Sequence, residues 1–290
     1  MTAPLIPLED LQSLTRSLLA CGARVDEINT LRRHLDQVKG GGLAKATQAQ
    51  IISLILSDVV GNPLEAIASG PTAPDPSTKA DAFEVLKKYG LTNSVPAEIV
   101  SALKNAPETP KTGDGLFTRV ENILVGSNAL AAQAALNQAE SEGFAIEFLG
   151  DDWQGEARET SKALCERLKK YPTVGKPLCL VAGGETTVSL RGDGKGGRNL
   201  ELALAAVGEL AGQENTMLIT LATDGEDGPT DAAGAVVTGE TNQRARSLGL
   251  DEAQYLSRND SYIFFTTLED ALKIGSTGTN VNDLTFLFKL

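Results

Sequence analysis

A glycine-rich stretch carrying two basic side chains is the part of this 290-residue sequence best suited to chemistry. Glycines let backbone N–H groups approach an anion closely, and a helix that begins beside them adds partial positive charge. A cation at that helix start opposes the helix dipole unless an anion accompanies it, and arginine suits a forked grip on an oxyanion. We therefore expect an anion site; the alternative is a flexible hairpin loop with solvated basic residues. The candidates are Gly183, Gly184, Glu185, Thr186, Lys195, Gly196, Gly197, Arg198 and Asn199.

Two named nucleotide motifs match this stretch poorly. Gly192, Gly194 and Gly197 satisfy G-x-G-x-x-G, but the acidic residue expected ~20 positions later is absent, since Asp224 lies 27 positions beyond Gly197. The P-loop needs serine or threonine after its Gly-Lys pair, and here Lys195 is followed by glycine. Any nucleotide bound by this stretch is therefore held in a different way.

An acidic segment follows the apolar run MLITLA. Carboxylates gathered at the end of a strand repel one another unless a cation neutralises them. Mg²⁺ with phosphate is a suitable cation, because it uses one or two carboxylates together with water and substrate oxygens. We expect Asp224, Asp227 or Asp231 to serve Mg²⁺; an exposed acidic turn is the alternative.

Two further polar segments are candidates for ligand contacts. Ser57 and Asp58 follow the apolar run IISLIL and could orient a small hydroxy acid, although an ordinary loop would have the same composition. Asn280 and Asn282 lie in a polar loop before the last apolar segment and either close over a ligand or make a turn.

Composition excludes several classes of function. The net charge of −12, from 26 basic and 38 acidic residues, disfavours nucleic acid and anionic membranes as partners. One histidine and three scattered cysteines cannot form a His/Cys zinc site within one chain. The N-terminus lacks the pattern of a secretory signal, and the apolar runs are strand-sized. We expect a cytoplasmic protein that works on small molecules.

Hydrophobic periodicity predicts an α/β protein of about two domains. The chain opens on two helices, followed by a buried, parallel-type strand at IISLIL and helices at 78–89 and 97–105. A strand–helix–strand–helix unit is expected over 120–170, and the polar break at 169–177 is the best boundary. Beyond it we expect strands LCLVAGG, TTVSL and MLITLAT, a helix at 200–210, a helical stretch at 241–257 and a final strand.

Seven ordered motifs resemble those of the type 2 glycerate kinases, which combine DUF4147 and MOFRL domains. Relatives of this family are sometimes labelled hydroxypyruvate reductase. The resemblance covers nearly the whole chain, and the ordered set is far more specific than any single motif. The motifs are NTLRRHLDQVKGGGLA, SDVVGNPLEAIASGPTAPDPST, VGSN, GGETTV, GKGGRNLELAL, ATDGEDGPTDAAGA and GSTGTNVNDL.

This resemblance implies a fold, an activity and a set of ligands. It predicts an N-terminally truncated, Rossmann-like parallel-sheet domain at 1–172 and a MOFRL α/β domain with a mixed sheet at 173–290. It implies that ATP and Mg²⁺ are used to phosphorylate D-glycerate at its 2-hydroxyl, giving 2-phosphoglycerate. The family arginine implicated in catalysis corresponds to Arg198, which we expect to stabilise phosphoryl charge or to grip the glycerate carboxylate.

The sequence also departs from the family pattern. Family members carry a Gly-Lys-Ala motif with a lysine thought to be catalytic, and a Ser-Gly-Gly-Gly-Ser loop, upstream of the matched region, and neither motif occurs here. Impaired kinase activity is therefore one expectation. The alternatives are an NAD(P)H-dependent hydroxypyruvate reductase and an inactive ligand-binding remnant. We expect D-glycerate and ATP as partners, without nucleic acid or membrane, and the sequence leaves a homodimer open.

Overall fold

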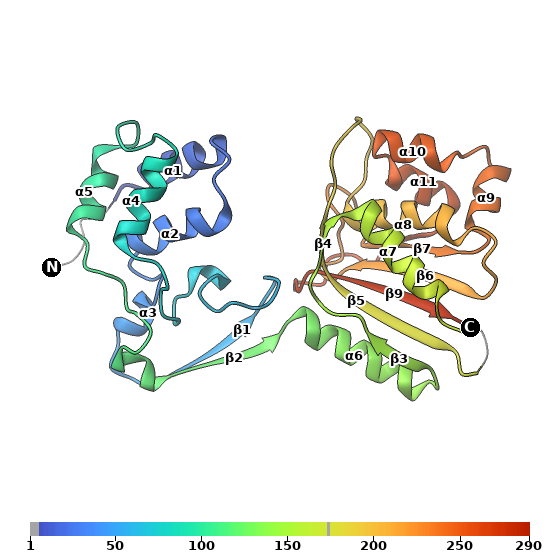
Figure 1. Cartoon of the computed structure of the whole chain (residues 1–290), viewed down its shortest axis with the longest axis horizontal. Coiled ribbons are helices and arrows are strands. Elements are labelled where there is room, and N and C mark those ends of the chain that lie inside the picture. Colours follow the sequence, from blue (N-terminus) through green and yellow to red (C-terminus); the bar gives the residue numbers. More distant parts are fainter. Residues whose placement is uncertain (1–5, 173–174) are drawn as a thin grey trace. The chain divides into compact units, whose positions relative to one another are not determined.

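The computed structural model describes residues 6–172 and 175–290, which form two compact units. Of the described residues, the first unit comprises 6–55 and 62–125, and the second comprises 56–61, 126–172 and 175–290 (Figure 1). The division into family domains at 1–172 and 173–290 stays a prediction, and its edge falls on residues 173–174, outside the described part. The compact units divide elsewhere, because the strand at 145–148 pairs with the strand that begins at Leu178.

The first unit is a helical cluster around an apolar core. Helices α1, α2, α4 and α5 bury one side each, with Leu18, Leu31, Leu86 and Ile99 almost fully buried where they meet. The predicted helices at 78–89 and 97–105 are confirmed within one residue. The helices are α1 (Leu8–Ala20), α2 (Val25–Leu35), α3 (Gly42–Lys45), η1 (Ile67–Ser69), α4 (Lys79–Lys88), α5 (Ala97–Asn105) and η2 (Gly115–Arg119).

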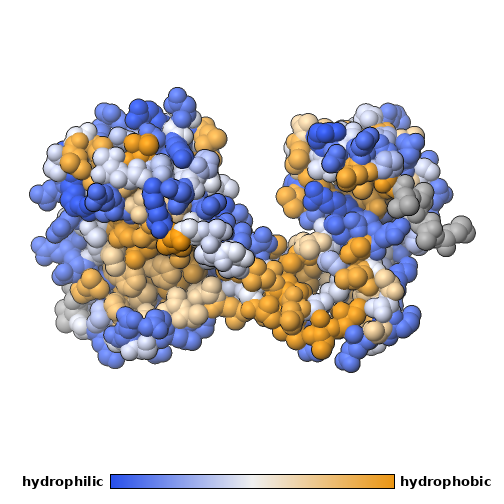
Figure 2. All heavy atoms as spheres, turned by 180° about the vertical axis from the view of Figure 1, so that it is seen from behind, coloured by the Kyte–Doolittle hydropathy of each residue, from blue (hydrophilic) through white to orange (hydrophobic). Residues whose placement is uncertain are grey.

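A two-stranded sheet of β1 (Ile51–Leu56) and β2 (Val120–Gly126) carries the chain from the first unit into the second. We expected β1 to be buried, but Ile52 and Leu54 are 60% and 69% exposed, and Val125 of β2 is 54% exposed. Figure 2 shows hydrophobic surface along the segment that this two-stranded sheet forms. An apolar strand is buried only where other elements cover both of its faces, and the local sequence does not show whether they do.

The second unit is built on a mixed sheet that, in the described residues, has seven strands in the order β3-β5-β9-β6-β7-β8, with β4 also paired to β5. Strands β3 and β4 run parallel to β5, whereas β9 lies antiparallel between β5 and β6. The prediction of a mixed sheet is therefore confirmed. The strands are β3 (Ala145–Phe148), β4 (Trp153–Glu156), β5 (Leu178–Thr187), β6 (Thr216–Ala222), β7 (Gly234–Thr238), β8 (Ala271–Leu272) and β9 (Asp283–Lys289).

Helices cover both faces of this sheet (Figure 1). Successive residues of a strand point to opposite faces, so Cys179 and Val181 of β5 pack under α6 while Leu180 and Ala182 face α7 and α8. Helix α8 is buried along most of its length, and its apolar residues pack into the core of the second unit. The helices are α6 (Asn128–Ser141), α7 (Ala157–Lys169), α8 (Arg198–Leu210), α9 (Thr241–Ser247), α10 (Glu252–Arg258) and α11 (Ser261–Leu268).

One strand prediction was wrong in its bounds. TTVSL does not form a second strand: β5 continues through Thr187, and residues 188–197 form the loop that leads to α8. The last residues of β5 are held by β4, where Gln154 lies opposite Glu185. Across the described residues, none of the helices has the length and apolar character needed to cross a membrane.

Candidate functional site

A cleft of about 1120 Å³ opens in the second unit at the end of β5 and the start of α8. Its wall brings together residues that are far apart in the sequence: the loop after β1, the end of β5, the glycine-rich loop and the acidic segment after β6. Seven predicted site residues line it, namely Asp58, Glu185, Thr186, Gly196, Gly197, Arg198 and Asp227.

Arg198, the first residue of α8, is gripped by two carboxylates. Its Nε and Nη2 donate to the two carboxylate oxygens of Asp283 at 2.5 and 3.1 Å, and its Nη1 lies 3.2 Å from Oε1 of Glu185. Burial alone would lower the pKa of Arg198, but the hydrogen bond to Asp283 and the nearby carboxylates outweigh it and raise that pKa. The guanidinium is therefore a fixed positive charge with one edge anchored and the other facing the cleft.

Asp283 is the first residue of β9, and its backbone is held by the buried side-chain amide of Asn128 on α6. Asn128 donates from Nδ2 to the carbonyl oxygens of Val281 and Asp283 at 2.9 and 2.8 Å. A Cβ on Gly183 of β5 would lie 1.6 Å from Oδ1 of Asn128, so only glycine fits there. Burial raises the pKa of Asp283, an effect that the hydrogen bond from Arg198 partly offsets.

Asp227 closes the N-terminus of α8. Its carboxylate accepts from the backbone N–H groups of Asn199 and Leu200 at 3.1 and 2.8 Å, which satisfies two of the donors that a helix start leaves free. The carboxylate lies so close that a Cβ on Gly197 would be 2.3 Å from its Cγ. Burial raises the pKa of Asp227 to about 6, against the lowering effect of the two backbone hydrogen bonds. The helix-start position that we expected a ligand to use is thus partly occupied by this side chain.

Several backbone amides of the glycine-rich loop donate hydrogen bonds to other parts of the protein. Arg191 and Gly192 donate to Oδ1 of Asn259, and Lys195 donates to Oδ1 of Asp260. Gly194 donates to the carbonyl of Arg258. These bonds give the loop a defined path, so the amides left to face the cleft are those at its end, around Gly196 and Gly197.

The three predicted metal ligands are not gathered into one site. Asp227 is committed to α8, and Asp231 accepts from the Tyr262 hydroxyl at 2.6 Å and pairs with Lys273 at 3.1 Å. Asp224 accepts from the backbone of Glu226 in its own turn. Over residues 6–172 and 175–290, no three His, Cys, Asp or Glu side chains are placed to hold a metal ion together.

The remaining predicted residues lie outside the cleft wall. Gly183 and Gly184 are buried within β5, Ser57 bonds to the backbone of Val59, and Lys195 places its Nζ 4.5 Å from the centre of the Tyr262 ring. Asn280 and Asn282 shape their own turn, in which Oδ1 of Asn280 accepts from the backbone of Asn282 at 2.9 Å. Asn199 is buried behind Asp227.

Asn259 and Glu201 are polar residues of the cleft wall that were not singled out from the sequence. Asn259 is 3% exposed, adopts a positive φ of 55° and bridges the glycine-rich loop to Glu201. Glu201 in turn pairs with Arg158 of α7. An asparagine at the end of a helix is a signal for the left-handed conformation, but its partners lie about 60 positions away and give no local pattern.

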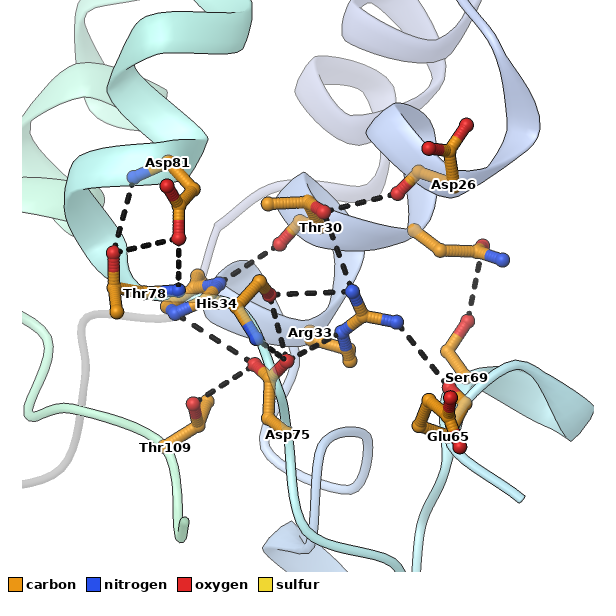
Figure 3. Close-up of polar contacts among 12 residues, drawn as sticks. Asp26, Thr30, Arg33, His34, Glu65, Ser69, Asp75, Thr78, Asp81 and Thr109 are labelled. Carbon is orange, nitrogen blue, oxygen red and sulfur yellow. Dashed lines mark hydrogen bonds and ion pairs between the residues drawn. The ribbon is translucent and has the colours of Figure 1, made fainter. Parts of the chain in front are cut away.

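The first unit contains a separate buried charge network (Figure 3). Arg33 of α2 pairs with Asp75 through Nε and Oδ1 at 2.8 Å and donates from Nη2 to Thr30 and Ser77. His34 donates from Nδ1 to the Thr30 carbonyl at 2.8 Å, and its Nε2 lies 3.0 Å from Glu108. The network ties α2 to the loops around it and makes the histidine a structural residue of that unit.

Comparisons with family models divide the chain into two matched regions. A model described as "Domain of unknown function (DUF4147)" matches residues 1–104, and a model described as "MOFRL family" matches residues 178–283. The second match contains Glu185, Arg198, Asp227 and Asp283.

Curated relatives and solved structures match nearly the whole chain. D-glycerate 2-kinase of Thermotoga maritima is 43% identical over 286 residues, which are 96% of this chain and 66% of the relative. Glycerate kinase of Macaca fascicularis is 39% identical over 333 residues, covering 98% of this chain and 84% of the relative. The crystal structure of glycerate kinase from Thermotoga maritima superposes with a TM-score of 0.91 at 42% identity and covers 98% of this chain and 68% of that one. The chain thus spans about two thirds of the length of the Thermotoga relative.

Proposed function

The chain belongs to the glycerate kinase family, and we propose that its cleft supports transfer of a phosphoryl group from ATP to the 2-hydroxyl of D-glycerate, giving 2-phosphoglycerate. The observation that carries the proposal is the Arg198 guanidinium, which is anchored on one edge by Asp283 and presents Nη1 to a cleft of about 1120 Å³. Phosphoryl transfer asks a protein mainly for positioning and for charge that stabilises the transferring group. The cleft supplies both without a nucleophilic side chain.

We assign the following roles to the residues around the cleft. Arg198 neutralises charge on the transferring phosphoryl group, and the amides at Gly196 and Gly197 lie beside it for a phosphate oxygen. Asp283 and Asn128 keep the guanidinium in place rather than touching substrate. Thr186, the neighbour of Glu185, contributes a hydroxyl to the wall.

The carboxylates of the cleft could bind Mg²⁺ only if the nucleotide phosphates supplied most of its ligands. Glu185 pairs with Arg198, both oxygens of Asp227 accept from α8, and Glu201 pairs with Arg158. Glu185 and Asp58 are the exposed carboxylates of the wall, and among the described residues Asp58 makes no ion pair. One available carboxylate suits Mg²⁺ held mostly by phosphate oxygens and water, so we propose Asp58 as the protein ligand. Bound there, the ion would neutralise charge on the phosphates.

The test is ADP formation from D-glycerate, ATP and Mg²⁺ by the full chain. We expect Arg198→Ala to abolish turnover and Lys169→Ala to leave it unchanged, because Lys169 lies at the end of α7, pairs with Glu209 and does not line the cleft. Full turnover by Arg198→Ala would overturn the assignment. NADH oxidation with hydroxypyruvate in the absence of Mg²⁺ would support the hydroxypyruvate reductase alternative over the kinase.

A further inference from the structure

The two carboxylates that hold Arg198 are not equivalent. Asp283 makes two hydrogen bonds to the guanidinium, and its side chain is 10% exposed at the start of β9. Glu185 makes one ion pair, through Nη1 at 3.2 Å, and its side chain is 46% exposed. The two-pronged, buried pair with Asp283 is fixed in geometry. The single exposed ion pair with Glu185 contributes little free energy and is easily exchanged for another partner.

The charges around Arg198 do not balance. One guanidinium faces two carboxylates, and Asp227 adds a third negative group that acts on Arg198. Like charges within a few ångströms repel one another in a partly desolvated cleft. An anion that approaches Arg198 therefore meets excess negative charge unless one carboxylate moves away, and Glu185 is the one free to move.

Glu185 also occupies the edge of Arg198 that a ligand would use. Both side chains line the cleft, together with Gly196 and Gly197. The backbone of Glu185 is held in β5 opposite Gln154, so its long side chain can swing without any change in the sheet. We propose that Glu185 is an exchangeable counter-ion of Arg198, and that an oxyanion of the ligand displaces it from Nη1 while Asp283 keeps its grip on Nε and Nη2. Glu185 thereby sets the affinity of the cleft for oxyanions. This inference builds on the anion-binding role of Arg198 in the proposed function.

The experiment is calorimetry of anion binding to the full chain without Mg²⁺. Tripolyphosphate and D-glycerate serve as separate probes, because a phosphate and a carboxylate offer the same oxyanion chemistry. For the probe that reaches Nη1, we expect Glu185→Gln to tighten binding about fivefold, the size of an exposed ion pair. The matched control is Glu147→Gln, which removes the same charge from another Glu–Arg pair of the second unit, 37% exposed and formed with Arg167. It should leave the affinity unchanged.

A thermodynamic cycle with Arg198→Ala separates exchange at Nη1 from a general effect of charge. The gain from Glu185→Gln should vanish in the Arg198→Ala background, since no guanidinium is left to be released. Unchanged or weaker binding by Glu185→Gln, for both probes, would overturn the inference. An equal gain with and without Arg198 would overturn it as well.

Failure of this inference is distinguishable from failure of the kinase proposal. Tighter anion binding by Glu185→Gln in a protein that forms no ADP from D-glycerate would support the exchange and refute the proposed reaction. ADP formation that depends on Arg198, combined with unchanged binding by Glu185→Gln, would support the reaction and refute the exchange. Melting curves of each variant check that the cleft is folded.

Discussion

Replacing Asp227 by asparagine should change how the stability of the second unit depends on pH. Burial raises the pKa of Asp227 from its usual 3.8 to about 6. Between these two values the folded protein binds a proton at this site more tightly than the unfolded chain does. The free energy of unfolding contributed by Asp227 therefore falls as the pH rises through that window. A shift of about two units corresponds to about 3 kcal/mol.

Asp231, four positions along the same segment, provides a control of opposite sign. Its exposed carboxylate has a pKa lowered by the Tyr262 hydroxyl and by Lys273. Its contribution to stability is present above its ordinary pKa of 3.8 and is lost as the pH falls below it. Asp231→Asn should thus cost stability at neutral pH and cost less in acid.

The assay is urea denaturation followed by the fluorescence of Trp153, the single tryptophan, which lies in β4 of the second unit. The stability of Asp227→Asn is subtracted from that of the wild type at each pH, which cancels the carboxylates they share. We expect this difference to fall by about 3 kcal/mol from about pH 3 to pH 7. A difference that stays flat or rises with pH would refute the account of Asp227 as a buried carboxylate at the start of α8.

Two further changes test the packing around buried polar groups, and a third tests the exposed apolar surface of β1. Arg33→Ala removes the nearest ion-pair partner of the fully buried Asp75 carboxylate, and should cost the first unit about 3–5 kcal/mol in urea denaturation followed by circular dichroism; a loss below 1 kcal/mol would contradict it. Gly183→Ala places a methyl group against Asn128 and should lower the melting temperature by several degrees, with partial recovery when Asn128→Ala is added; an unchanged melting temperature would count against the close contact. Leu54→Thr removes an exposed apolar side chain from β1 and should reduce light scattering at high concentration without loss of stability, and equal scattering would contradict this.

Much of the fold could be predicted because its signals are local. Helix α6 follows a serine whose hydroxyl accepts from the backbone of Leu130, and the pattern of a capped helix is visible in VGSN and the alanine-rich run after it. The short strand β7, Gly234–Thr238, was missed because its apolar run is only three residues long. Its place depends on pairing with β6, which only the folded chain shows.

The position of Arg198 at the start of a helix could be predicted from the sequence, whereas its partners in the fold could not. A cation at the start of a helix needs an anion, and this argument singled out Arg198 from the sequence. Its partner Asp283 lies 85 positions away, and the amides that Asp227 satisfies lie 27 and 28 positions before it. Spacing suggested that the aspartates share a cation. The structure instead gives Asp227 to a helix start and Asp231 to a tyrosine and a lysine, because each finds a nearer donor in the fold.

The most direct test of the central claim is phosphorus NMR of the product formed from D-glycerate, ATP and Mg²⁺. The account predicts a 2-phosphoglycerate resonance with the wild-type chain and with Lys169→Ala, and none with Arg198→Ala. Phosphorylation at the 3-hydroxyl would contradict the assigned reaction. A 2-phosphoglycerate signal of full intensity from Arg198→Ala would contradict the role given to the guanidinium in the cleft.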